Sequence, residues 1–94
     1  MKKSLRTPRQ RLLQSLLTEA RKTGGMTQAE LAAALGKPQS FVAKYENGER
    51  RIDVIEFADI TAALGVSGAD LLARLAHGEE KSSPKEKNTT SQDE

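Results

Sequence analysis

Apolar residues recur along this chain at the spacing of an α-helix. They form stripes at Leu12, Leu13, Leu16, Leu17 and Ala20, at Phe57, Ile60, Thr61 and Leu64, and at Leu71, Leu72 and Leu75. Residues three and four apart lie on one face of a helix, so each stripe predicts an amphipathic helix. No stretch alternates apolar and polar residues with the period of two typical of a strand. The pattern predicts an all-α protein.

Three segments share one local arrangement, in which an apolar residue precedes a capping residue and a carboxylate follows three positions later, before another apolar residue. They are Met26-Thr27-x-x-Glu30-Leu31, Ile52-Asp53-x-x-Glu56-Phe57 and Val66-Ser67-x-x-Asp70-Leu71. The capping oxygen can accept a free N–H of the first helical turn, and the carboxylate can accept the N–H of the capping residue. Each arrangement predicts the start of a helix.

Proline and glycine mark the remaining helix ends. Thr7-Pro8-x-Gln10 predicts a fourth start, because proline lacks an N–H that the first turn does not need. Left-handed ends are predicted at Gly24, Gly36, Gly48, Gly65 and Gly78. Together these signals predict five helices, at residues 8–23, 28–35, 38–47, 54–64 and 68–77.

The second and third predicted helices are joined only by Gly36-Lys37. So short a turn makes the two helices cross steeply, which is typical of a helix-turn-helix motif. In the third helix Val42 and Tyr45 are three residues apart and are predicted to point inward, with Phe41 beside them. The opposite face carries Gln39, Ser40, Ala43, Lys44 and Asn47.

The residue types on that opposite face suit a DNA major groove. Gln and Asn can bond two positions of one base, Lys can reach guanine or a phosphate, and the small Ser and Ala let the helix approach closely. By composition alone, the same residues would also fit an ordinary solvated helix face.

This region resembles the Cro/phage-repressor type of helix-turn-helix, the XRE family, over about residues 9–75. The residues that carry the resemblance are Thr27-Gln28-x-Glu30-Leu31-Ala32, Leu35-Gly36, Gln39-Ser40-x-Val42-x-Lys44-Tyr45 and Glu46-Asn47-Gly48-Glu49-Arg50. The resemblance implies a compact five-helix, lambda-repressor-like DNA-binding domain over residues 8–77. Its third helix would lie in the major groove of duplex DNA.

The resemblance also implies roles for individual residues. Base contacts are expected from Gln39, Ser40 and Lys44, with Phe41 reaching a thymine methyl group. Phosphate contacts are expected from Gln28 and Asn47. An internal ion pair is expected between Arg21 and Glu46. Pro38 departs from the Ser or Thr common at this position, which removes a hydroxyl cap and a backbone N–H from the start of the third helix.

Composition narrows the class of protein further. The chain has 94 residues, no Cys and one His, which excludes a disulfide-stapled module and a zinc finger and leaves room for one small domain. It has no apolar run long enough for a signal peptide or a membrane span, so we expect a soluble, cytoplasmic protein. Neither a cofactor nor a metal is expected, and no segment is recognisable as forming a ligand pocket.

Charge is distributed unevenly. Residues 1–77 carry twelve Lys and Arg against eight Asp and Glu, a net charge of +4, whereas residues 78–94 have a net charge of −2. We expect a basic arm at 1–7 and a disordered acidic tail at 78–94, because the tail has no Leu, Ile, Val, Phe or Met to bury. Phosphate contacts are also expected from Arg9, Arg50 and Arg51.

Enzymatic activity is not expected. The acids at Asp53, Glu56 and Asp70 are explained as helix caps, and His77 lies in the last turn of a helix, where a partial positive charge suits the helix dipole. So short a chain offers no cleft that would raise the pKa of a catalytic carboxyl group.

The favoured interpretation is a sequence-specific transcription regulator, acting as a repressor and binding palindromic operator DNA as a homodimer. One module reads few base pairs, and two copies on a palindrome double the contacts. We expect the dimer surface on the last helix, at Leu71, Leu72 and Leu75. The main alternative is an antitoxin-like protein that binds a toxin and represses its own operon. A third is a protein-interaction module that has lost DNA binding.

Overall fold

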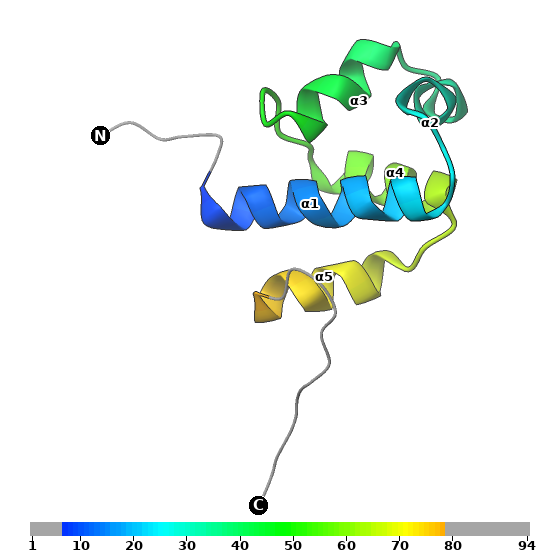
Figure 1. Cartoon of the computed structure of the whole chain (residues 1–94). Helices are drawn as coiled ribbons and strands as arrows, with labels where there is room; N and C mark the ends of the chain where they lie inside the picture. Colours follow the sequence, from blue (N-terminus) through cyan, green and yellow to red (C-terminus); the bar gives the residue numbers. More distant parts are fainter. Residues whose placement is uncertain (1–6, 79–94) are drawn as a thin grey trace, which may run out of the picture.

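The computed structural model describes residues 7–78, and this part of the chain consists of five α-helices without a strand (Figure 1). The helices are α1 (Pro8–Thr23), α2 (Gln28–Leu35), α3 (Gln39–Glu46), α4 (Val54–Leu64) and α5 (Gly68–His77). The all-α prediction is confirmed, and only α3 differs from its expected bounds, by one residue at each end. Apart from Thr7 and Gly78, the predicted arm and tail lie outside the described residues.

The helices begin at the predicted capping residues. At α2 the Thr27 hydroxyl accepts the N–H of Glu30 at 3.0 Å, and the Glu30 carboxylate accepts the N–H of Thr27 at 2.9 Å. Asp53 and Glu56 form the same reciprocal pair at the start of α4, at 2.7 and 2.8 Å. Hydroxyl caps open α1 and α5, from Thr7 and Ser67. Local hydrogen bonding therefore sets where these helices start.

The end of α1 differs from the expectation. Gly24 was predicted to be left-handed, but its φ is −78° and its N–H still reaches Ala20 O at 3.0 Å. The left-handed step is made by Gly25, with φ 76°. Since two glycines stand together, the helical hydrogen bonding continues through the first and the chain turns at the second.

All five helices contribute side chains to one core. The buried apolar residues are Leu12, Leu16, Leu17, Leu31, Ala32, Phe41, Val42, Tyr45, Phe57, Ile60 and Leu71. Helix α1 contacts both α3 and α5, which lie on opposite sides of it in Figure 1. This arrangement leaves the outer face of α3 open. Within the described residues, no helix has the length and apolarity needed to cross a bilayer.

Candidate nucleic-acid interface

The outer face of α3 carries the polar residues that the sequence predicted there. Gln39, Ser40 and Lys44 are exposed, and Asn47 is exposed at the C-cap of the helix. On the other side, Val42 and Tyr45 are 0% and 2% exposed. Packing of the inner face thus fixes the orientation of the outer one, which projects two amide groups, a hydroxyl and an ammonium group into solvent.

The carboxylate of α3 is turned away from that outer face. Nε of Arg21 donates to Oε2 of Glu46 at 2.7 Å, and Nη2 donates to Oε1 at 3.0 Å. The side chains are 10% and 5% exposed, so the pair is largely removed from water. The hydrogen bonds that Arg21 donates to Glu46 raise the pKa of Arg21 above its ordinary value. Arg21 therefore cancels an acid that would otherwise repel phosphates.

Glu46 also connects the buried pair to the outer face. Nε2 of Gln28 donates to Oε1 of Glu46 at 2.9 Å, and Oε1 of Gln28 accepts from Nε2 of Gln39 at 3.4 Å. The first bond is short and ends on a charged oxygen, so it holds Gln28 firmly, whereas the second is long and weak. The amide groups that begin α2 and α3 are thus brought together.

Phe41 does not lie where the resemblance implied. It is only 8% exposed and packs edge-to-face against Tyr45, with ring centroids 5.5 Å apart. Two cations cover its ring, since Nζ of Lys37 lies 5.3 Å and the guanidinium carbon of Arg50 4.8 Å from its centroid. This burial counts against contact with a thymine methyl group, because the ring is already enclosed by its own domain.

Arg50, predicted to contact a phosphate, makes hydrogen bonds within its own chain instead. Its Nη1 and Nη2 donate to the two carboxylate oxygens of Glu56 at 3.0 and 2.9 Å, and Nη1 also donates to Arg51 O at 2.7 Å. Hydrogen bonds from Arg50 and from the Asp53 N–H lower the pKa of Glu56. Arg50 therefore ties the chain after α3 to the start of α4.

The remaining predicted phosphate contacts lie on the surface. Arg51 is exposed before α4, and Arg9 is exposed in the first turn of α1. Pro38 is the N-cap of α3 and makes no side-chain cap bond, as the sequence predicted. Arg51 and Arg9 are therefore accessible to solvent, and neither belongs to the core.

The leucines predicted for a dimer surface do not share one exposed face. Leu71 is 6% exposed and belongs to the core, and Leu75 packs against the core. Only Leu72 is exposed, at 51%. This burial counts against a dimer surface made of all three leucines, because two of them are used to attach α5 to the rest of the domain.

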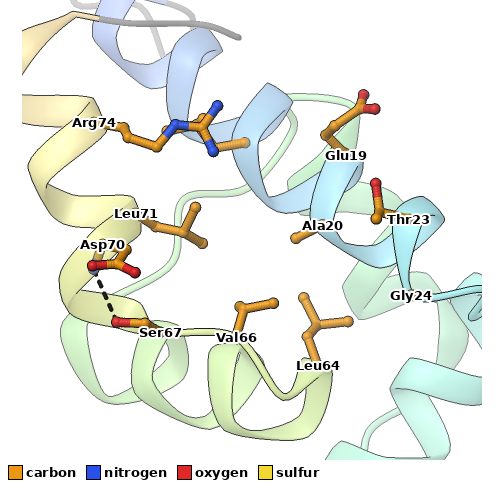
Figure 2. Close-up of a pocket in the computed structure, with 11 residues that line it drawn as sticks. Glu19, Ala20, Thr23, Gly24, Leu64, Val66, Ser67, Asp70, Leu71 and Arg74 are labelled. Atoms are coloured by element: carbon orange, nitrogen blue, oxygen red, sulfur yellow. Dashed lines mark hydrogen bonds between the residues drawn. The ribbon is translucent and has the colours of Figure 1, made fainter. Parts of the chain in front are cut away.

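Leu71 also lies in a pocket of about 360 Å³ between α1 and α5 that the sequence did not predict. Figure 2 shows Ala20, Leu64, Val66 and Leu71 facing this space, with Glu19, Thr23, Asp70 and Arg74 around it. Its lining comes from α1, the end of α4 and α5, and α5 lies on the side of α1 away from α3 (Figure 1). No residue predicted to contact DNA lines it.

Three contacts in the structure were not predicted from the sequence. Lys37 covers Phe41, Arg50 binds Glu56, and Gln28 binds Glu46. Arg50 and Glu56, and likewise Gln28 and Glu46, come from different elements at separations that follow no helical repeat. Lys37 is four residues from Phe41, but it lies in the turn before α3, where the helical pattern does not apply. The exposed apolar pair Val54 and Ile55 was missed because it immediately follows a predicted cap.

The helix-turn-helix family model HTH_3 matches residues 17–71, more than half of the chain. The chain belongs to this Cro/C1-type helix-turn-helix family. The matched region runs from the middle of α1 to the first turn of α5, so it contains α2, α3 and the ion pair between Arg21 and Glu46. As a member of this DNA-binding family, the chain has its open polar face on the helix that enters DNA in helix-turn-helix proteins.

Solved structures agree with this assignment. An XRE-family like protein from Pseudomonas syringae pv. tomato str. DC3000 is 54% identical, with a TM-score of 0.71 over 73% of this chain and 84% of that one. The clp gene regulator ClgR from C. glutamicum is 29% identical, with a TM-score of 0.65 over 77% and 92% of the two chains.

The restriction-modification controller protein C.AhdI from Aeromonas hydrophila is also similar, at 26% identity and a TM-score of 0.62 over 66% of this chain and 94% of that one. A search of curated proteins found no match. This XRE-type chain therefore shares its fold with proteins named as gene regulators or controllers.

Proposed function

We propose that this XRE-type protein regulates transcription by reading palindromic operator DNA as a homodimer through α3. One observation carries the proposal. The exposed face of α3 presents Gln39, Ser40 and Lys44, while Glu46, its acid, is bound by Arg21. A face with hydrogen-bonding groups and a free cation, but no free carboxylate, is suited to the bases and phosphates of a major groove.

In this proposal the polar residues divide into two groups. Gln39, Ser40 and Lys44 read base edges, because they project from the exposed face of α3. Phosphates are bound from both ends of the motif and from the flanking helices, by Gln28, Asn47, Arg51 and Arg9. Arg50 acts indirectly, by fixing the chain between α3 and α4 through Glu56.

Two copies are needed because a single α3 of eight residues reaches only a few base pairs. A two-fold dimer presents two such helices about one turn of DNA apart, roughly 34 Å. The names of the similar proteins, a gene regulator and a controller protein, support a role in transcription. Repression is the proposed outcome, because a dimer seated on an operator that overlaps a promoter excludes polymerase from the same DNA.

Selection of bound sites from a random pool of duplex DNA tests the proposal directly. We expect enrichment of an inverted repeat whose half-sites are centred about 10 base pairs, or a multiple of this, apart. Lys44→Glu, which places an acid on the open face of α3, is the matched control and should recover no consensus. Failure of the parent protein to enrich any sequence would overturn the proposal, and an enriched direct repeat would overturn the two-fold dimer.

A further inference from the structure

Helix α4 has an unusual outer side. Of its three polar residues, Glu56 is bound by Arg50, and Thr61 is buried with its hydroxyl donating to Phe57 O at 3.1 Å. Glu56 keeps 18% exposure within its ion pair, and only Asp59 is a fully exposed charged residue of this helix. A helix on the surface of a globular protein normally carries several charged residues on its outer face. The outer side of α4 is largely apolar instead.

Large apolar side chains stand at the start of this outer side. Val54 is 79% and Ile55 is 68% exposed, more than any other large hydrophobic residue in the described part of the chain. Ala58 and Ala62, one and two turns further along, are exposed as well. Successive turns of α4 thus expose branched and then small apolar side chains. Because no long side chain projects among them, another helix can approach this face closely.

A hollow of about 160 Å³ adjoins this projecting pair. Its apolar lining comes from Leu35, Phe41, Ile55 and Ile60. Charged residues of both signs line it too, namely Lys37, Asp53, Glu56 and Asp59. The same patch therefore contains a protrusion and a recess, and both a cation, Lys37, and an acid without an ion pair, Asp59.

We propose that a second copy of this chain docks here, with the two α4 helices paired across a two-fold axis. Val54 and Ile55 of each copy cover the hollow of the other, and Lys37 of each copy lies against Asp59 of the other. A patch that carries both a shape and its complement, and both signs of charge, matches itself under a two-fold rotation and closes as a dimer. A uniformly basic partner surface would repel Lys37, and a uniformly acidic one would repel Asp59.

The position of the patch suits the proposed function, on which its role at DNA rests. Helix α4 follows α3 after residues 47–53, and Arg50 fixes this connection to Glu56. Pairing through the start of α4 therefore sets the distance between two α3 helices rigidly. Helix α5 exposes less apolar surface than α4, because Leu72, at 51% exposure, is its single exposed large apolar side chain.

Sedimentation equilibrium without DNA tests the surface. Val54 and Ile55 occupy the first turn of α4, where an acid favours a helix, so the double variant Val54→Glu, Ile55→Glu should stay folded. We expect its dimer dissociation constant to rise at least about a hundredfold, as for residues central to an interface. Leu72→Glu is the matched control and should change the constant less than about threefold, as expected at a position outside an interface.

Charge reversal provides a second test, again by measuring the dimer dissociation constant with sedimentation equilibrium. Lys37→Glu should weaken the dimer, and adding Asp59→Lys should restore it, because the unlike pair then forms again with its signs exchanged. Dissociation by Leu72→Glu with no effect at Val54 and Ile55 would overturn the proposal. So would a parent protein that stays monomeric at all concentrations measured, or charge reversals whose effects simply add.

Binding to DNA separates this inference from the proposed function. The neutral variant Val54→Ser, Ile55→Ser should lose the inverted-repeat preference but keep salt-sensitive binding to a single half-site. A monomer that still binds half-sites supports both proposals. If the parent dimerises through α4 but binds no duplex at all, the interface stands and the proposed function fails.

Discussion

At the scale of single residues, one buried charge pair has two consequences. Arg21 neutralises Glu46, which clears α3 of negative charge, and Glu46 in turn holds Gln28 beside Gln39. A chain of bonds that starts in α1 therefore holds Gln28 firmly and reaches Gln39, at the start of the exposed face of α3, through one weak bond. A change at Arg21 should be felt both in stability and at the DNA face.

Removing either partner of this pair should be costly. Arg21→Met or Glu46→Leu leaves a charge with 10% or less exposure and no counter-charge, so we expect a loss of about 3 kcal/mol in the free energy of unfolding. The double variant should recover about half of that loss, since no charge is left unpaired. Urea denaturation measures all three, and additive losses would show that the pair is not coupled.

Lys44 and Asn47 should behave differently on DNA. Lys44→Ala should cost about 1–3 kcal/mol on the selected site and relax the preference at one position in each half-site. Asn47→Ala should weaken selected and random duplexes by the same factor, because a phosphate contact carries no sequence information. Fluorescence titration with both duplexes checks this. An equal loss on both duplexes for Lys44→Ala would remove it from base reading.

At the scale of elements, the connection from α3 to α4 is held by Arg50. Its guanidinium lies over the ring of Phe41 in α3 and binds Glu56 in the first turn of α4. The Glu56 carboxylate also accepts the N–H of Asp53, the N-cap residue of α4. One cation thus joins two helices and supports the cap between them. This connection decides how α3 is oriented relative to α4.

The pair with Arg50 should make stability depend on pH. Arg50 and the Asp53 N–H lower the pKa of Glu56 in the folded state, so its stabilising effect is complete above its ordinary value of 4.5 and is lost as the pH falls through the lowered pKa. Glu56→Gln should therefore be less stable than the parent at neutral pH, with a gap that narrows below about pH 4.5. Urea unfolding from pH 7 to pH 3 measures the gap.

Glu49→Gln is the control for this experiment, because Glu49 is exposed in the same connection and takes no part in the pair with Arg50. Its stability should follow that of the parent across the range. A gap for Glu56→Gln that stays constant down to pH 3 would mean that its loss comes from packing or capping and not from the charge.

At the scale of the whole molecule, charge favours nucleic acid. Residues 1–77 have a net charge of +4, and Lys44, Arg51 and Arg9 are exposed. If a dimer neutralises about six phosphates, affinity should fall roughly a thousandfold between 50 and 200 mM salt. Titration of the selected duplex at several salt concentrations measures the slope. A flat titration would contradict the proposal that this surface binds phosphates.

The sequence alone determined the helices and the sides of α3. Caps such as Thr27 with Glu30 act within one turn, and the stripe of Val42 and Tyr45 depends only on helical periodicity, so both can be read from neighbouring residues. The exposure of Gln39 and Lys44 follows from the same local rule. Pairing of Arg21 with Glu46, 25 residues apart, came from the family resemblance and is present in the structure.

Only the tertiary structure decided which apolar residues are left outside. Leu71 and Leu72 are the same residue type, but successive residues of a helix are about 100° apart around its axis. Packing of α5 against α1 and α4 therefore buries Leu71 and leaves Leu72 exposed. Phe41 is enclosed by Lys37 and Arg50 for the same kind of reason. Such outcomes depend on how distant helices cross, and that geometry is absent from any short stretch of sequence.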